Sequence, residues 1–227
     1  MDEFTSNDHT VFTASDSWRV FRVLSELVEG FEKMTSIGPS VSIFGSARLT
    51  EKSPYYALAV ETAKVISEKN FAIITGGGPG IMEAANKGAQ LAKGKSCGLG
   101  IDLPFEAALN NYIDLDYRLQ FRYFFIRKVM FIRYAQGYIF LPGGYGTLDE
   151  LFEALTLIQT KKIKPFPIYL LGSKYWEGLL GWINETLLEM DCITKEDLKL
   201  IQLTDSPQEA ANGIERHYQR DRALRNF

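Results

Sequence analysis

The sequence has few of the residues that build metal centres and disulfides. Its 227 residues include two cysteines, Cys97 and Cys192, and two histidines, His9 and His217. These four residues lie far apart and match no zinc-binding spacing, so we expect no Cys/His metal site. The low cysteine content and a polar, acidic N-terminus without a secretory leader lead us to expect a protein of the reducing cytoplasm.

Other absences narrow the function further. No apolar run approaches the roughly 20 residues of a membrane-spanning helix. The net charge of −3 gives no overall attraction to nucleic acid or to a membrane surface. The glycine-rich segments at residues 76–80 and 143–146 do not fit the G-x-G-x-x-G pattern followed by an acidic residue, and neither carries the Lys-Ser/Thr pair of a P-loop. The sequence therefore favours neither dinucleotide binding nor hydrolysis of a nucleoside triphosphate.

What is present is an alternation of short apolar runs with amphipathic segments. Residues 1–16 are polar and we expect them to be flexible, whereas residues 17–227 are predicted to form one domain. The predicted strands are residues 40–44, 71–74, 95–101, 138–141 and 168–171, with weaker candidates near 115–117 and 200–203. The predicted helices begin at Ser17 and Pro207 and span 54–69, 81–91, 121–134, 151–159, 175–190 and 195–198. This alternation predicts an α/β fold with a Rossmann-like, doubly wound parallel sheet.

The most informative segment spans residues 138–150 and reads YIFLPGGYGTLDE. An apolar strand ends at a proline, and three glycines then allow positive φ and a close approach of the backbone to a ligand. Thr147 is in a position to cap the next helix, with Glu150 at capping-box spacing. A glycine turn at a helix N-terminus is typical of a phosphate-binding site.

Two other predicted strands end in small residues. Residues 75–80 read TGGGPG, and Gly45 and Ser46 follow the first strand. Ligands of open parallel sheets bind beyond the carboxyl ends of the strands, where these turns meet. Two glycine-rich turns in one sheet favour a mononucleotide or a sugar phosphate as ligand. The alternative is that the glycines only close tight turns.

Several charged residues near these turns allow two interpretations. Arg127 and Lys128 are neighbours on a predicted helix, so one can face the crevice and the other the surface, or both can form salt bridges. Glu150 either completes the capping box or presents a carboxylate to a ribose. Glu83 can stabilise a helix dipole, and Met82 can be a packing residue.

Together these segments resemble the Lonely Guy family. Residues 76–83 read GGGPGIME, the Arg127-Lys128 pair follows, and residues 142–150 read PGGYGTLDE. The family is that of the cytokinin riboside 5'-monophosphate phosphoribohydrolases, long mislabelled as lysine decarboxylases. Its pattern, PGGxGTxxE with an upstream Arg-Lys pair, is met at every fixed position. The resemblance covers roughly residues 41–188.

The resemblance implies a Rossmann-like fold, a homodimer with active sites near the subunit interface, and no cofactor. It also implies hydrolysis of the N-glycosidic bond of a nucleoside 5'-monophosphate. Many members have His or Glu just before the Arg-Lys pair, whereas this chain has Phe125 and Ile126. We therefore expect AMP or a cytokinin-type nucleotide as substrate, with AMP favoured. The family's catalytic roles fall on Arg127 and Glu150. The candidate substrate-binding residues are Gly45, Ser46, Gly76, Gly77, Gly78, Gly80, Met82, Glu83, Lys128, Gly143, Gly144, Gly146 and Thr147.

Two rival functions use the same loops. Relatives of this fold include molybdenum-cofactor carriers, which hold a phosphorylated ligand without converting it. A carrier needs the phosphate loop but no carboxylate at the ribose, so Glu150 favours the enzyme. The second rival, a PLP-dependent lysine decarboxylase, is disfavoured because this chain has no strong internal lysine candidate.

The aromatic helix predicted at 121–134 is apolar on several faces, and we expect part of it to pack against a second subunit.

Overall fold

Seven parallel strands form a single sheet in the computed structural model, which describes residues 14–103 and 109–220, with side chains from Trp18 onward. The strand order is β4-β3-β2-β1-β5-β6-β7, and every neighbouring pair is parallel. The predicted doubly wound parallel sheet is therefore confirmed. The strands are β1 (Ser40–Phe44), β2 (Ala72–Thr75), β3 (Ser96–Ile101), β4 (Arg118–Phe121), β5 (Ala135–Phe140), β6 (Ile168–Leu171) and β7 (Ile201–Thr204).

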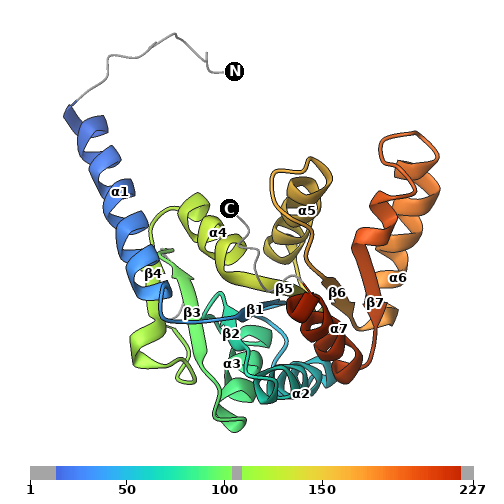
Figure 1. Cartoon of the computed structure of the whole chain (residues 1–227), viewed down its shortest axis with the longest axis horizontal. Coiled ribbons are helices and arrows are strands. Elements are labelled where there is room, and N and C mark those ends of the chain that lie inside the picture. The colour runs from blue at the N-terminus through green and yellow to red at the C-terminus, as the bar shows by residue number, and fades with distance from the viewer. Residues whose placement is uncertain (1–13, 104–108, 221–227) are drawn as a thin grey trace, which may run out of the picture.

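Helices cover both faces of the sheet (Figure 1). Alternate strand residues point to opposite faces, so Ile73 and Ile139 pack with one set of helices while Ile74 and Phe140 pack with the other. The first set is α2 (Pro54–Glu68), α3 (Ile81–Leu91) and α7 (Pro207–Arg220). The second is α1 (Ala14–Met34), α4 (Phe124–Tyr134), α5 (Tyr145–Gln159) and α6 (Ser173–Trp182). In the described part of the chain, no helix is both long and apolar enough to cross a membrane.

The strand order reverses at β1, whose neighbours are β2 on one side and β5 on the other. Chain connections leave the carboxyl ends of β1 and β5 in opposite directions, and this leaves a crevice between the loops that follow them. The glycine-rich segments singled out in the sequence follow β2 and β5. The fold thus brings both segments to the same edge of the sheet.

The N-terminal helix is longer than predicted. It begins at Ala14, so Ser17 lies inside α1 and is not its N-cap, and residues 14–16 belong to the helix instead of a flexible tail. Residues 1–13 of the predicted flexible segment lie outside the described residues. The C-terminal part of α1 is held by the fold, because Met34 is buried and Val23, Leu27 and Phe31 pack against the core.

The segment before α4 also differs from prediction. Residues 115–117 form a 3₁₀-helix instead of a strand, and the strand β4 follows it. Phe121 was expected in the helix but ends β4, where it pairs with Ile101 of β3. Pairing along the open edge of the sheet outweighs the helical pattern of its sequence. Further on, the predicted helix 175–190 is α6 followed by a π-helix, Ile183–Leu188, and the predicted 195–198 helix is a 3₁₀-helix, Asp197–Leu200.

Candidate active site

Three loops meet at the carboxyl edge of the sheet and enclose a cleft of about 970 Å³. The loops after β1, β2 and β5 are joined by backbone hydrogen bonds. The Ser46 N–H donates to the Pro142 carbonyl over 3.0 Å, and the Ile81 N–H donates to the Ser46 carbonyl over 3.0 Å. Residue 46 therefore links the two glycine-rich loops, and the walls of the cleft are fixed relative to one another.

The loop after β5 leads directly into α5, which begins at Tyr145 with Gly144 as its N-cap. Thr147 is thus the third residue of the helix and not its cap, and the predicted capping box does not form. The expected positive φ is also wrong, because the positive-φ glycines of the described residues do not include Gly143, Gly144 or Gly146. A side chain on Gly143 would collide with Thr147, whereas nothing lies within 4 Å of a Cβ on Gly144 or Gly146.

The loop after β2 uses its glycines differently. Gly77 and Gly80 have φ values of +76° and +69°, a region that residues with a Cβ rarely adopt. A Cβ on Gly80 would lie 2.5 Å from the Ser46 carbonyl oxygen, and one on Gly77 would collide with Leu109. These two glycines allow close backbone packing and do not line the cleft, while Gly76 and Gly78 do line it.

A buried polar network holds the loop after β2. The Asn110 side-chain amide donates to the carbonyls of Gly77 and Gly78 over 3.1 and 3.0 Å. It also donates to Asn86 Oδ1, which accepts a further hydrogen bond from Thr75 Oγ1 over 2.7 Å. Because Asn86 and Thr75 are fully buried, this loop is anchored from inside the protein.

Glu150 lies at the floor of the cleft, on the second turn of α5. It lines the cleft, yet only 4% of the residue is exposed. Its Oε1 is 3.5 Å from Lys128 Nζ, and its Oε2 is buried with no hydrogen-bond partner among the described residues. A buried carboxylate oxygen without a partner is costly, so this oxygen is a candidate to meet a ligand or a water molecule.

Burial raises the pKa of Glu150 to about 7. The positive charges of Lys128 and Arg127 lower this pKa, and the negative charges of Glu153 and Asp149 raise it further. Burial is the largest of these effects, so the carboxyl group titrates near neutral pH. Such a shift in a cleft is typical of functional carboxylates.

Lys128 does not line the cleft, so the structure does not bring this predicted substrate-binding residue to the site, and its role stays a prediction. Its Nζ lies 2.8 Å from Asp149 Oδ2 and 2.9 Å from Glu153 Oε2, in addition to its contact with Glu150. Burial lowers the pKa of Lys128, but hydrogen bonds to Asp149 and Glu153 outweigh it and raise the pKa to about 12. Lys128 is therefore a permanent positive charge that holds α5 against α4.

Arg127, the other member of the pair, does face the cleft. Its guanidinium carbon lies 5.0 Å from the centre of the Phe124 ring and 5.8 Å from that of Phe131. A Cβ on Gly76 would lie 3.9 Å from its Nη1, which places the guanidinium beside the loop after β2. Held by two aromatic rings, Arg127 presents its charge to the cleft in a restricted geometry.

Glu83 lies in the first turn of α3, whereas Glu150 lies in the second turn of α5. Glu83 turns away from the cleft. It accepts a hydrogen bond from the Tyr56 hydroxyl over 3.2 Å and is absent from the cleft lining. The structure therefore does not place Glu83 in the cleft, and its substrate-binding role stays a prediction. Met82 does line the cleft, and a Cβ on Gly76 would lie 2.8 Å from its sulfur.

Most of the predicted residues converge on one site. Those that line the cleft are Gly45, Ser46, Gly76, Gly78, Met82, Arg127, Gly143, Gly144, Gly146, Thr147 and Glu150, and those that do not are Gly77, Gly80, Glu83 and Lys128. The sequence interpretation missed a group of lining residues that come from several elements. They include Arg48, Leu49, Tyr55, Ile101, Leu103, Phe124, Tyr145, Leu148 and Tyr175.

Of the missed residues, only Tyr145 had a signal in the sequence, since it occupies the variable position of the glycine motif. Tyr145 is 92% exposed at the mouth of the cleft. Tyr175 comes from α6, and its hydroxyl donates to the Gly143 carbonyl over 2.5 Å. Such a contact between distant segments follows from tertiary packing, which no local pattern predicts.

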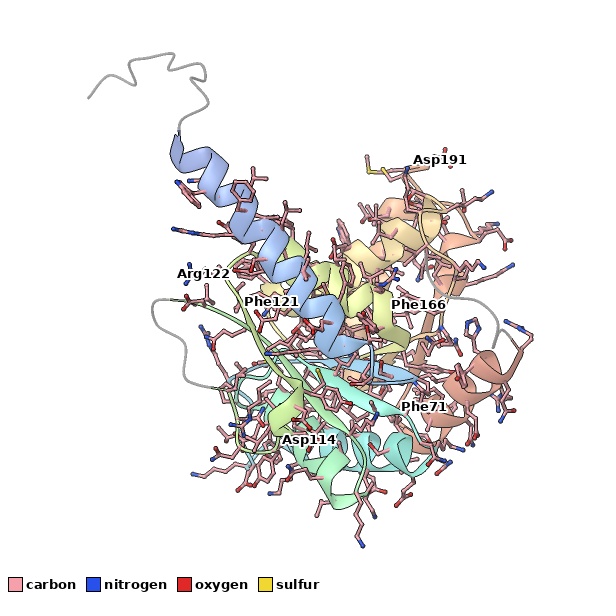
Figure 2. The ribbon with its side chains drawn as sticks, turned by 60° about the vertical axis from the view of Figure 1, so that its left-hand side comes forward. Phe71, Asp114, Phe121, Arg122, Phe166 and Asp191 are labelled. Carbon is pink, nitrogen blue, oxygen red and sulfur yellow. The ribbon has the colours of Figure 1, made fainter. Side chains whose placement is uncertain are left out.

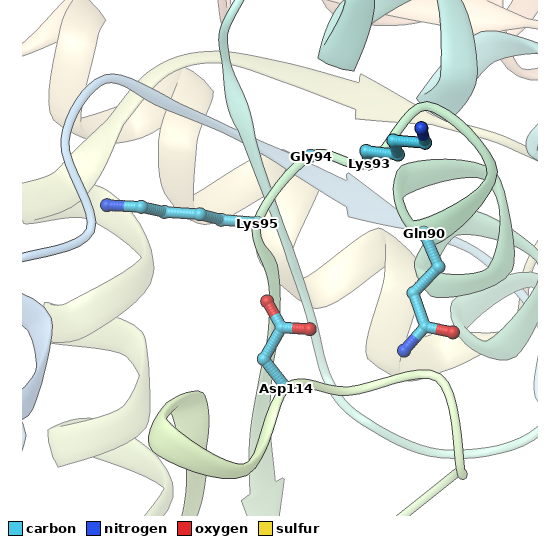
Figure 3. A pocket seen from close by; sticks show the side chains of 5 residues that line it. All are labelled: Gln90, Lys93, Gly94, Lys95 and Asp114. Atoms are coloured by element: carbon cyan, nitrogen blue, oxygen red, sulfur yellow. The ribbon is translucent and has the colours of Figure 1, made fainter.

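A second hollow, of about 410 Å³, lies at the opposite edge of the sheet, where β3 begins. Figure 3 shows its lining side chains, with Lys95 extending away from Lys93 and Gln90. Lys95 Nζ donates to the carbonyls of Ser36 and Ile37, and Asp114 Oδ2 accepts from the Ser96 N–H. The charged groups of Lys95 and Asp114 thus form hydrogen bonds with the backbone, so this hollow is not the candidate site. No cluster of His, Cys, Asp and Glu within the described residues has the composition of a metal site.

Comparison with known proteins shows a match to one family model and similarity to several proteins. The family model described as "Possible lysine decarboxylase" matches residues 82–214. A probable cytokinin riboside 5'-monophosphate phosphoribohydrolase of Oryza sativa is 25% identical over 207 residues, which are 88% of this chain and 80% of the relative. An uncharacterised protein of Archaeoglobus fulgidus is 29% identical over 60% of this chain and 87% of its own length.

Solved structures agree with the fold. The molybdenum cofactor carrier protein of Chlamydomonas reinhardtii superposes with a TM-score of 0.57 at 18% identity, over 80% of this chain and 99% of the carrier. A molybdenum cofactor binding protein of Rippkaea orientalis gives a TM-score of 0.54 at 22% identity, over 78% of this chain and 94% of its own. At these identities the likeness concerns the fold alone. The family match and the sequence relatives go further, and from them it follows that the chain belongs to the Lonely Guy family, whose family model still carries the lysine decarboxylase description.

Proposed function

We propose that the protein hydrolyses the N-glycosidic bond of a nucleoside 5'-monophosphate, releasing the free base and ribose 5-phosphate. AMP is the expected substrate, and a cytokinin-type nucleotide is a second member of the same class. The observation that carries this proposal is the Glu150 carboxyl group, buried at the floor of the cleft with Oε2 unpartnered among the described residues. Membership of a family with phosphoribohydrolase relatives supports it.

The phosphate would bind at the N-terminus of α5. The first N–H groups of a helix have no partner within the helix, and its dipole favours an anion there. Gly144 and Gly146 leave open space at this end, so a phosphate can approach the backbone closely. With the phosphate held there, the ribose would lie over the second turn of α5, next to Glu150.

In the reaction, the bond between C1' of the ribose and the base nitrogen breaks, and the base departs with the electron pair. The ribose ring gains oxocarbenium character, and a water oxygen forms the new bond to C1'. One water proton goes to the base and the hydroxyl remains on the ribose. The ionised Glu150 carboxylate stabilises the positive charge on the ring and orients the water.

Arg127 would act from the opposite wall of the cleft. Its guanidinium, held near the Phe124 and Phe131 rings, is placed to bind either the phosphate or the negative charge that develops on the leaving base. Lys128 acts through α5: its ion pairs with Asp149 and Glu153 on both sides of Glu150 fix the carboxylate without occupying the cleft.

A carrier of a phosphorylated ligand is the alternative. The likeness to molybdenum cofactor carriers concerns the fold, and a carrier has no need for a buried carboxyl group beside the phosphate loop. The two functions differ in one observable. An enzyme releases free base from the bound nucleotide, whereas a carrier returns the ligand unchanged.

The first test compares AMP with adenosine. Because the proposed phosphate site binds a dianion, kcat/KM for base release should be at least about a hundredfold higher for AMP, which corresponds to roughly 3 kcal/mol of binding energy. Free base is measured by chromatography after incubation with a panel of nucleoside monophosphates and nucleosides. Equal kcat/KM for AMP and adenosine contradicts the phosphate site, and tight binding without base release supports the carrier.

A further inference from the structure

A buried hydroxyl group lies on the face of the sheet that packs against α4 and α5. It belongs to Tyr138 of β5, which is fully buried, and its Oη has no hydrogen-bond partner among the described residues. The Tyr138 ring has three aromatic neighbours, with centroids 5.0 Å away for Phe44, 5.8 Å for Phe140 and 4.8 Å for Phe166, which is labelled in Figure 2. A hydroxyl in such apolar surroundings is costly unless it is hydrogen-bonded, so this group calls for a partner.

The complementary group lies on α5. Oε2 of Glu150 is the buried carboxyl oxygen that lacks a hydrogen-bond partner among the described residues. Tyr138 offers an O–H donor and the carboxylate offers an acceptor, so each group can supply what the other lacks. Tyr138 also packs in the same hydrophobic cluster as Leu151 and Ala154, which follow Glu150 on α5. The tyrosine therefore extends from the sheet toward the part of α5 that carries Glu150.

The electrostatics of Tyr138 agree with this placement. Burial raises the pKa of Tyr138 well above its ordinary value, and the negative charges of Glu150 and then of Glu153 raise it further. Glu153 already accepts a hydrogen bond from Lys128 Nζ over 2.9 Å, so Glu150 is the carboxylate that still needs a donor. Ser42 of β1 carries another buried hydroxyl without a partner among the described residues, but its short side chain keeps it at the sheet.

We propose that Tyr138 is a positioning residue for Glu150, and that its hydroxyl donates through one buried water molecule toward Oε2 of the carboxylate. The two groups do not bond to each other directly, and a water that joins two polar groups is a common part of protein interiors. Each carboxylate oxygen has two acceptor positions, so Oε2 can accept this bond on its inner side and still face the cleft. Lys128 lies 3.5 Å from Oε1, so both oxygens of the carboxylate are then held.

The link acts on the ionised form of Glu150. The charged groups that act on this carboxyl group come from two helices: Lys128 and Arg127 from α4, and Asp149 and Glu153 from α5. The strand β5 adds a neutral donor, and a hydrogen bond to a carboxylate favours its ionised form over its protonated form. In the proposed reaction, Tyr138 thus keeps Glu150 ionised and oriented toward the ribose. This consequence rests on the proposed function, whereas the hydrogen-bonded link does not.

An NMR titration of the Glu150 carboxyl carbon tests the link without any substrate. The protein is labelled with ¹³C-glutamate, and the Glu150 signal is assigned by its loss in Glu150→Gln. Tyr138→Phe removes the hydroxyl and keeps the ring, so the midpoint of the titration should move to higher pH by at least about half a unit, a roughly threefold smaller ionisation constant. Tyr169→Phe is the matched control, because Tyr169 is a buried tyrosine of the neighbouring strand β6 that belongs to the core of the opposite face. An unchanged midpoint in Tyr138→Phe, or an equal shift in both variants, overturns the proposal.

The pH dependence of kcat/KM for base release from AMP tests the consequence for catalysis. In Tyr138→Phe the acidic limb of the profile should move in the same direction and by the same amount as the NMR midpoint, whereas Tyr169→Phe should keep the wild-type profile. A limb that stays in place while the NMR midpoint moves overturns the positioning role. A wild-type protein that releases no base contradicts the proposed function instead, and the NMR titration then still decides whether Tyr138 is linked to Glu150.

Discussion

The two glycine-rich loops at the cleft look alike in sequence and differ in what their glycines do. After β2, Gly77 and Gly80 take positive φ, and a Cβ there would collide with the Leu109 side chain and with the Ser46 backbone, respectively. Asn110 anchors this loop from inside. After β5, Gly144 and Gly146 take no positive φ and face open space. The loop after β2 packs closely against neighbouring segments, whereas the loop after β5 forms an open surface at a helix N-terminus.

The helices that follow the two loops differ in the same way. Glu150 of α5 is buried in the cleft lining, and Glu83 of α3 turns away to a tyrosine hydroxyl. Two similar motifs therefore contribute different things: one fixes the shape of the cleft, and the other carries the buried carboxyl group on which the proposed reaction depends. The predictions below each change a residue in one loop or helix, and three of them use a residue of the other loop or helix as a control.

The largest effect is expected from Gly80→Ala. The new methyl group would lie 2.5 Å from the Ser46 carbonyl oxygen and 2.7 Å from the Ala47 backbone, in a backbone conformation with φ +69°. Strain and overlap together should lower the free energy of unfolding by about 4 kcal/mol. Urea unfolding measures this change. Gly144→Ala is the control, and a loss of similar size there would remove the distinction between the loops.

The next effect concerns the stability of Glu150→Gln as a function of pH. The pKa of Glu150 is about 7 in the folded state against an ordinary value of 4.5, so ionisation of this group lowers folding stability as the pH rises through this interval. Gln does not ionise. The variant should therefore be more stable than the wild type at pH 8 by roughly 3 kcal/mol, and by less than about 1 kcal/mol at pH 5.

Urea unfolding at both pH values measures this difference. Glu83→Gln is the control, because it removes a carboxylate near the N-terminus of α3 without removing a buried charge from the cleft. A pH-independent difference between Glu150→Gln and wild type would show that the Glu150 carboxyl group is not destabilised by burial.

A smaller effect is expected from Gly144→Ala on nucleotide binding. The methyl group has room in the protein, since nothing lies within 4 Å, but it enters the space where the proposed phosphate meets the N-terminus of α5. KM for AMP should rise by about tenfold, or roughly 1.4 kcal/mol, with little change in kcat or melting temperature. Steady-state kinetics of base release measure it. An unchanged KM would place the phosphate elsewhere in the cleft.

Local sequence patterns predicted the sheet and its helices well where the pattern was strong. Helix 81–91 and strand 168–171 have the predicted bounds. Ser206 also caps α7 as expected, accepting a hydrogen bond from the Glu209 N–H over 3.2 Å. Such elements are specified by neighbours in the chain, namely periodicity, capping residues and proline.

The predictions that were wrong concern residues whose structure depends on contacts between distant segments of the chain. Phe121 pairs with Ile101 across β3 and β4, which outweighs its helical pattern. Lys128 binds three carboxylates of α5, and only the packing of α4 against α5 decides that Arg127 faces the cleft instead. Thr147 lies within the first turn because α5 begins three residues earlier than a Thr147 cap requires. The sequence therefore predicted which residues line the cleft better than it predicted the contacts that each of them makes.

The most direct test of the account compares kcat for base release from AMP in Glu150→Gln and Glu83→Gln. Gln keeps the shape of Glu150 but loses the charge that opposes the oxocarbenium ion, so kcat should fall by roughly 10²-fold or more, while the Kd for AMP changes only a few-fold. Glu83→Gln should retain near-wild-type kcat. A folded Glu150→Gln variant with near-wild-type kcat would contradict the claim that this carboxylate supplies the chemistry.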